Sequence, residues 1–401
     1  MEPSVDPRAT ELPPENSSEP PAEDTSSLEE QFGAPDEIVE DAFPAENPRQ
    51  LLLVVGSGRS GTSVLAGALQ RLGFHVPQPE VTPDETNPRG FGEPQWVVDF
   101  HTELLARATV QVTDARPSSW ARAAETGYDI TQRARLADWL TGEFAISDQV
   151  VIKDPRLLWF VPLWRLAAED AGSEARFITM LRHPAEVVAS KERWYDNFSN
   201  PTNRLAGWIN TMLYTERATR DTARAFVLFD ALLSDWAPTI ALLDAQLGLS
   251  IMREVRIRHL QAVDQLIDPG LRRSRETWEA IEAPKQLIEL ADRVWADTLS
   301  LAGGTEPPPD VHDRLDAARR DYVRTYADAE AIAYSSVLAA RRAGQRAPRK
   351  PAEVPVIALT PPETTSPTTK NVVGRGLRSL PSGVKQLVPE SIRGPLRRRF
   401  N

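Results

Sequence analysis

A glycine-rich segment, Gly56 to Ser63, holds the first residues whose types and spacing could do chemistry. It follows a short apolar run and has the sequence GSGRSGTS. Its three glycines allow backbone N–H groups to approach an anion closely, and a helix predicted to begin near Gly61 adds its positive end. Hydroxyl groups and the planar guanidinium of Arg59 are further donors. The segment therefore predicts a cradle for a phosphate or sulfate group.

The lysine of a nucleotide-binding P-loop is missing from this segment. Gly56 and Gly61 have P-loop spacing, but Thr62 stands where that lysine would reach the outer phosphates of a triphosphate. Triphosphate hydrolysis would lack its main cation, whereas a smaller anionic group could still bind. A P-loop-type nucleotide or small-molecule kinase stays open as an alternative, with Asp154 as its one convincing metal-binding aspartate. A glycine-rich turn without any ligand is the other alternative.

The elements around this segment alternate between strands and helices. Strands are predicted for 51–55, 149–152, 176–181 and 225–229, and helices for 61–72, 156–170, 204–222 and 232–247, with a further helix starting at Pro184. This order predicts an α/β, P-loop-like three-layer fold with a central parallel sheet flanked by helices. Right-handed crossovers place the carboxyl ends of the strands at one edge, where ligands bind in such folds. The glycine-rich loop, the turn from Lys153 to Arg156, and Arg182 should meet there.

The motif GRSGTS at 58–63 resembles the loop that follows the first strand of the sulfotransferases that use 3′-phosphoadenosine 5′-phosphosulfate (PAPS). The resemblance is to the bacterial branch, which is related to the tyrosylprotein and heparan sulfate sulfotransferases. It implies that the loop holds the 5′-phosphosulfate, with Arg59 as its cation, and that no metal is needed. The donor-binding residues expected in this loop are Gly56, Ser57, Gly58, Arg59, Ser60, Gly61, Thr62 and Ser63.

Three further segments extend the resemblance, which covers about residues 50–275. LRHPAEVVAS at 181–190 has the family's arginine–serine spacing, which implies that Arg182 and Ser190 bind the 3′-phosphate. VVIKDPR at 150–156 implies that Lys153 contacts the transferring sulfonate, and NPRGFGEPQWVVDF at 87–100 implies that Glu93 is the catalytic base. The chain departs from the family at Asp230 and the phenylalanine before it, where tyrosine and glutamate are expected.

These residues together predict an in-line sulfonate transfer. An acceptor hydroxyl has a high pKa and needs a base as it attacks, a role expected for Glu93. Lys153 and Arg59 would stabilise charge on the sulfonyl and bridging oxygens, so these three are the expected catalytic residues. The alternatives are an exposed loop carboxylate at Glu93 and a surface ion pair between Lys153 and Asp154. His183 is expected to cap the helix that starts at the following proline.

Composition divides the chain of 401 residues into three parts. Residues 1–48 are acidic and rich in proline and serine, which predicts disorder; 49–342 should form the catalytic domain; 343–401 should form a Pro/Thr-rich linker and a basic tail. The chain has no cysteine and only five histidines, which excludes thiolate chemistry and disfavours a histidine-rich metal site. No apolar run is long enough for a membrane span, and no secretory signal is present, so a cytoplasmic location is expected.

Partners follow from the same observations. PAPS and a hydroxyl-bearing acceptor, such as a carbohydrate or glycolipid, are expected, with residues 80–145 and 195–215 lining the acceptor site. Nucleic acid is disfavoured because the net charge is −11 and the core lacks an interleaved basic and aromatic surface. The basic tail is either solvated or makes a weak peripheral contact with anionic lipid at the inner membrane face. A non-catalytic nucleotide-binding scaffold, with the acidic N-terminus as its interaction arm, is the alternative from another class.

Overall fold

The computed structural model describes residues 49–346, apart from 86, 88, 195–198, 252–254, 273–274 and 305. The predicted disordered segment 1–48 and most of the predicted linker and tail, 347–401, lie outside the described residues. In chain order the elements are β1 (Gln50–Val55), α1 (Thr62–Arg71), α2 (Gln95–Ala108), α3 (Ser119–Gly127), α4 (Ile130–Phe144), β2 (Gln149–Lys153), η2 (Leu157–Phe160), α5 (Val161–Asp170), β3 (Glu174–Leu181), α6 (Pro184–Trp194), α7 (Pro201–Ala218), β4 (Arg224–Leu228), α8 (Phe229–Ser234), α9 (Trp236–Leu247), α11 (Ile257–Leu266), η3 (Pro269–Leu271), η4 (Trp278–Ala280), α12 (Lys285–Leu299) and α13 (Val311–Arg346).

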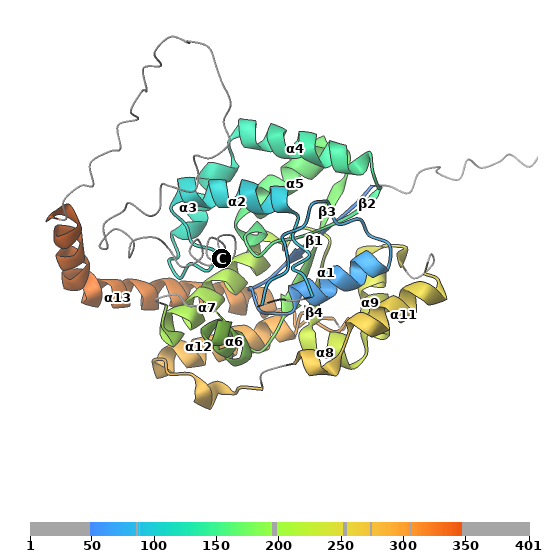
Figure 1. Cartoon of the computed structure of the whole chain (residues 1–401). Coiled ribbons are helices and arrows are strands. Elements are labelled where there is room, and N and C mark those ends of the chain that lie inside the picture. Colours follow the sequence, from blue (N-terminus) through green and yellow to red (C-terminus); the bar gives the residue numbers. More distant parts are fainter. Residues whose placement is uncertain are drawn as a thin grey trace, which may run out of the picture. The chain divides into compact units, whose positions relative to one another are not determined.

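A four-stranded sheet with the order β2-β1-β3-β4 lies at the centre of the fold, and all of its neighbouring strands are parallel (Figure 1). Leu53 of β1 lies opposite Ile152 of β2 and Phe177 of β3, so the carboxyl ends of these strands come to one edge. Every residue of β1 is buried, as its continuous apolar run requires in a sheet covered on both faces. The α/β class predicted from the sequence is confirmed.

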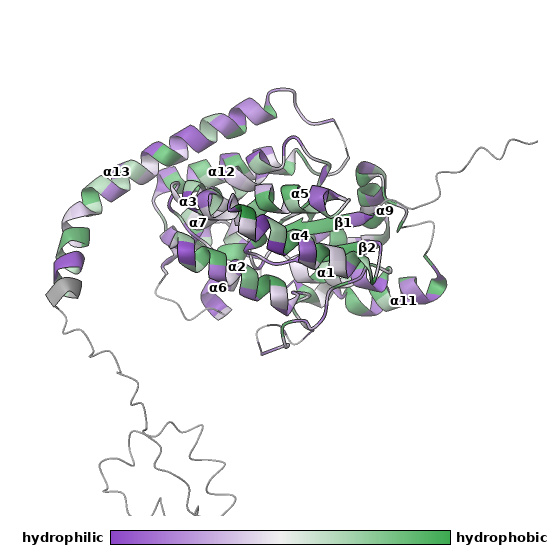
Figure 2. Ribbon diagram, turned by 90° about the horizontal axis from the view of Figure 1, so that it is seen from above, coloured by the Kyte–Doolittle hydropathy of each residue, from purple (hydrophilic) through white to green (hydrophobic). Residues whose placement is uncertain are grey.

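Helices cover both faces of the sheet because successive β1 residues point to opposite sides. Leu51, Leu53 and Val55 pack with α2, α3, α4 and α5, whereas Leu52 and Val54 pack with α1, α8, α9 and α11. Figure 2 shows the same pattern, with apolar residues along the strands and polar residues on the outer sides of the helices. The result is the three-layer arrangement that positions the ends of the strands beside helix N-termini.

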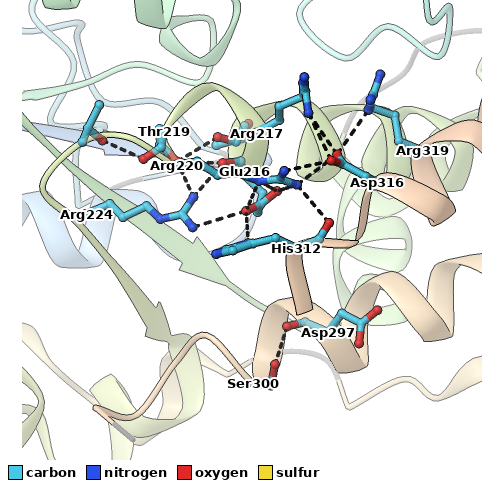
Figure 3. Close-up of polar contacts among 12 residues, drawn as sticks. Glu216, Arg217, Thr219, Arg220, Arg224, Asp297, Ser300, His312, Asp316 and Arg319 are labelled. Carbon is cyan, nitrogen blue, oxygen red and sulfur yellow. Dashed lines mark hydrogen bonds and ion pairs between the residues drawn. The ribbon is translucent and has the colours of Figure 1, made fainter. Parts of the chain in front are cut away.

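A third apolar cluster joins α6, α7 and α12 to the start of α13. Beside it lies a buried ionic network around Glu216 of α7, whose side chain is fully buried (Figure 3). The Glu216 carboxylate accepts hydrogen bonds from Arg220 at 2.7 Å and Arg224 at 3.3 Å, and Arg220 also pairs with Asp316 of α13 at 3.0 Å. These pairs fix α13 against α7 and β4. The described residues up to Ser335 belong to one compact unit, and 336–346 are the described part of a second.

Two helices differ from the prediction made for 156–170 and 232–247. The first begins with the 3₁₀ turn η2 before α5, and the second is divided into α8 and α9 at Asp235, whose φ of −154° and ψ of 90° are not helical. Pro238 explains the division, because a proline is tolerated in the first turn of α9 but not within a continuous helix. Within the described part of the chain, none of the helices combines the length and apolarity needed to cross a membrane.

Candidate functional site

A cavity of about 820 Å³ opens at the carboxyl edge of the sheet. Its walls come from the loop after β1, the segment 81–98, the loop 111–113, the end of β2, α6 and the start of α7. The cavity therefore receives residues from both segments, 80–145 and 195–215, in which an acceptor site was expected. Most of the predicted site residues line it: Gly58, Arg59, Gly61, Thr62, Ser63, Glu93, Lys153, Arg182 and Ser190.

The glycine-rich loop needs its glycines for two separate reasons. Gly56 and Gly61 have φ values of 134° and 94°, in the region that side chains rarely adopt. A Cβ at Gly61 would also lie 2.2 Å from the ring of Phe229. Gly61 is the N-cap of α1, and no side chain caps this helix, so its N-terminus is open toward an anion. Ser57 and Ser60 complete the loop and are buried.

Arg59 links the loop to α6. Its φ of 75° lies in the left-handed region, which residues other than glycine rarely adopt. Its Nε donates to Ser190 Oγ at 3.0 Å. Arg182 donates from Nη1 to the Arg59 carbonyl oxygen at 3.1 Å. The two anion sites predicted for the two ends of a nucleotide are therefore in direct contact across the Arg59 residue. Both guanidiniums and Ser190 can face one ligand from within the same cavity.

Arg182 is held on three sides. Its Nε donates to the buried Glu186 at 2.8 Å, and its guanidinium lies over the Phe229 ring, 4.8 Å from the centroid. Glu186 also accepts from Arg272 at 2.7 Å, and Arg272 pairs with Asp230 at 3.1 Å. Asp230 and Arg272 thus act on Arg182 through Glu186. The next residue, Arg273, lies outside the described residues. His183 caps α6 by accepting from the Ala185 N–H at 3.2 Å, as predicted.

Glu93 and Lys153 form a buried ion pair inside the cavity. Lys153 Nζ lies 2.5 Å from Glu93 Oε1 and also donates to Ser63 Oγ at 3.2 Å. The Glu93 side chain is 9% exposed and the Lys153 side chain is 5% exposed. Arg156 lies 3.8 Å from the second carboxylate oxygen. Burial raises the pKa of Glu93, although the charge of Lys153 opposes the effect. The structure therefore contradicts the alternatives of an exposed loop carboxylate and a surface pair between Lys153 and Asp154.

Asp154 instead stabilises the turn from Lys153 to Arg156 through buried hydrogen bonds. It is fully buried and accepts from His101 Nδ1 at 2.7 Å, from the Arg156 backbone N–H at 3.0 Å and from Arg156 Nη1 at 2.8 Å. Trp164 donates to His101 Nε2 at 2.9 Å, so His101 carries its proton on Nδ1. Burial is the largest single influence and acts to raise the pKa of Asp154, but the interactions with His101 and Arg156 together outweigh it and the pKa is lowered. These contacts orient Arg156 toward Glu93.

Lys191 also lines the cavity, although it was not among the predicted site residues. Its side chain projects from α6, directly after Ser190, and is almost fully buried. A signal was present, because a helix that starts at Pro184 places Lys191 on the same face as the apolar Val187 and Val188. Phe229 was also overlooked as a site residue, since it was expected to end a strand and instead begins α8 between the loop and Arg182.

No family model and no curated protein sequence matches this chain. The sulfotransferase domain from the Synechococcus PCC 7002 olefin synthase is a similar solved structure, with 16% identity and a TM-score of 0.36 over 68% of this chain and 96% of that one. The sulfotransferase domain from the curacin biosynthetic pathway has 15% identity and a TM-score of 0.36 over 65% and 99%. Sulfotransferase STF1 from Mycobacterium tuberculosis H37Rv has 19% identity and a TM-score of 0.31 over 62% and 76%.

Proposed function

We propose that this chain is a PAPS-dependent sulfotransferase that moves a sulfonate group to an acceptor hydroxyl. One observation supports the proposal above the others: a single cavity brings together the glycine-rich loop, Arg182 with Ser190, and the buried Glu93–Lys153 pair. These groups come from segments up to 131 residues apart in the chain. Together they would supply two anion sites and a base beside one another.

The cationic residues would bind and orient the donor. Arg182 and Ser190 would hold its 3′-phosphate, because both already contact Arg59, and the open N-terminus of α1 would receive the 5′-phosphosulfate. The donor itself supplies an activated sulfonate and a stable leaving group. Positioning and electrostatic stabilisation are then the main contributions of the protein.

Glu93 would remove the proton of the acceptor hydroxyl. The acceptor oxygen forms a bond to sulfur, the bond between sulfur and the bridging oxygen breaks, and adenosine 3′,5′-bisphosphate leaves with its electron pair. Lys153 contacts both Glu93 and Ser63 and would stabilise the charge that grows on the bridging oxygen. A buried carboxyl with a raised pKa suits this role, because a general base is most effective when its pKa is near the working pH.

The two alternatives from the sequence are less well supported. A kinase would need a carboxylate that can hold magnesium, and Asp154 is fully buried and bound by His101 and Arg156. A non-catalytic scaffold gives no reason to keep an ion pair such as Glu93–Lys153 buried, since desolvation of both charges is costly. The predicted contact of the tail with a membrane lies outside the described residues and stays a prediction.

Ligand-dependent stabilisation tests the proposal directly. Adenosine 3′,5′-bisphosphate should stabilise the full chain without magnesium by about 2.7 kcal/mol at a hundredfold excess over its Kd. Thermal unfolding followed by tryptophan fluorescence measures this, because the chain has ten tryptophans. AMP, which lacks the 3′-phosphate, should bind more weakly, and Ser190→Ala should remove most of the difference between the two nucleotides.

The control is ATP with magnesium. Stabilisation by ATP–magnesium with none by the bisphosphate would contradict the sulfotransferase proposal and favour the kinase. If the bisphosphate binds as expected, incubation with sulfur-35-labelled PAPS and fractionated cell extracts identifies the acceptor class through the labelled product.

A further inference from the structure

Lys191 is a buried cation that the proposed mechanism does not use. Its Nζ donates to Ser57 Oγ of the glycine-rich loop at 2.9 Å and to Thr113 Oγ1 at 3.1 Å. The residue is 3% exposed, yet it lines the cavity. Both hydrogen-bond partners are neutral hydroxyl groups. Among the residues that the structure describes, no carboxylate lies within ion-pair distance of this ammonium group.

A buried ammonium group without a counter-ion is costly in a folded protein. Burial, together with the charge of Arg204, lowers the pKa of Lys191 to about 7. The remaining charged side chains that line the cavity are Arg59, Lys153, Arg156, Arg182, Arg193, Asp84, Glu93 and Glu276. Cations outnumber carboxylates there, and Glu93 is already paired with Lys153. An anionic ligand would balance this excess of positive charge.

Lys191 lies beside a loop that lacks the lysine of a P-loop. Thr62 stands where a P-loop has its lysine, so the loop itself brings no ammonium group to an anion. Lys191 brings one from α6, 134 residues away in sequence, to the hydroxyl of Ser57 at the start of the loop. Ser57 and Thr113 keep the flexible lysine chain in place, so it is preorganised for a ligand in the loop.

We propose that Lys191 is a further cation of the glycine-rich loop, in addition to Arg59, and binds the anionic group on the 5′ side of the nucleotide. The inference rests on the proposed function for the identity of the nucleotide, and it adds a binding residue that the motifs do not contain. Lys191 and Ser190 are adjacent but bind different parts of the nucleotide: Ser190 binds the 3′-phosphate with Arg182, and Lys191 binds the group held by the loop. Their effects on ligands should therefore differ.

The test compares three probes on the full chain by isothermal titration calorimetry. The probes are adenosine 3′,5′-bisphosphate, AMP and inorganic pyrophosphate. Lys191→Met should raise the Kd of the bisphosphate and of AMP by the same factor, about tenfold, because both carry the 5′ group. Ser190→Ala should raise only the Kd of the bisphosphate. Lys285→Met, an exposed lysine on α12, is the matched control and should change neither.

The pH dependence is a second readout that a structural role would not produce. The wild-type Kd for AMP should rise on the order of tenfold relative to that of Lys191→Met between pH 6.5 and 8.5, because the free lysine loses its proton over this range. Taking the ratio to the variant removes the titration of the phosphate itself. Circular dichroism of each variant confirms that it folds, and Lys191→Gln replaces Lys191→Met if the latter does not.

The outcomes separate this inference from the proposed function. If the wild type binds the bisphosphate and Lys191→Met binds it equally well, the role of Lys191 is wrong and the proposed function stands. If only pyrophosphate binds, and Lys191→Met weakens it, the loop cation is supported and the nucleotide is wrong. If no probe binds the wild type, both are overturned.

Discussion

Replacing Lys191 by methionine should stabilise the ligand-free protein, and the gain should depend on pH. The lysine has a pKa of about 7 in the folded chain, against an ordinary value of 10.5. Between these values the unfolded chain binds a proton that the folded chain does not, so stability rises with pH across this window. Methionine has a similar volume and no charge, and it removes this dependence.

The size of the effect follows from the two pKa values. One pKa unit corresponds to about 1.4 kcal/mol, so the charged lysine costs the folded state up to about 5 kcal/mol well below pH 7. At pH 9 this cost has fallen to about 2 kcal/mol, because most of the window has been crossed. The loss of the hydrogen bonds to Ser57 and Thr113 opposes the gain by about 1 kcal/mol each, equally at both pH values. The stabilisation should thus be about 2.5 kcal/mol larger at pH 6.5 than at pH 9.

Urea unfolding of the full chain at the two pH values measures this difference through tryptophan fluorescence. Comparing the two pH values cancels the packing and hydrogen-bond contributions, which do not titrate. Lys285→Met serves again as the control, because its exposed side chain pairs with Glu289 at the surface. A free-energy change for Lys191→Met that is equal at pH 6.5 and pH 9 would refute the reasoning. So would a variant that is destabilised at both, since that result would make Lys191 a purely structural clamp.

Three further predictions concern the other buried charges. Glu93→Gln should lower kcat for sulfonate transfer from labelled PAPS by about 10²- to 10⁴-fold and leave the Kd of the bisphosphate unchanged, because it removes the base and not the anion sites; an unchanged kcat would exclude Glu93 as the base. Asp154→Asn should destabilise the chain by about 3–5 kcal/mol at pH 7 because His101 and Arg156 lose their shared carboxylate. The destabilisation by Asp154→Asn should shrink as the pH falls below 3.8, the ordinary pKa of an aspartate. The pKa of Asp154 is lowered in the folded chain, so its carboxylate stabilises the fold above pH 3.8, and this stabilisation is lost as the carboxylate becomes protonated. Denaturation curves at pH 7 and pH 3 test the direction of this change. Glu216→Gln should destabilise by about 3 kcal/mol because Arg220 and Arg224 lose the buried carboxylate between them, and the exposed Glu289→Gln is its control; equal midpoints in urea for the two variants would contradict this.

Local sequence was sufficient for the strands, the loop and the start of α6. The apolar run of β1 ending at Gly56 and the proline at position 184 each determine their conformation within a few residues, through burial and fixed backbone angles. The parallel direction of the strands followed from the alternation of elements, and with it the edge at which the loop, Lys153 and Arg182 meet. The division between α8 and α9 was not predicted, because the apolar pattern continues across Asp235 and Pro238 although the helix does not.

The sequence by itself determined the class of fold and the position of the glycine-rich loop, because both depend on short-range patterns. Only the tertiary structure decided how these residues are paired. Glu93 with Lys153, Asp154 with His101 and Lys191 with Ser57 join positions 60, 53 and 134 residues apart. No periodicity or local motif encodes such distances, since they arise from the order in which strands and helices pack. The pKa shifts arise there too, because desolvation depends on what the rest of the chain brings to each group.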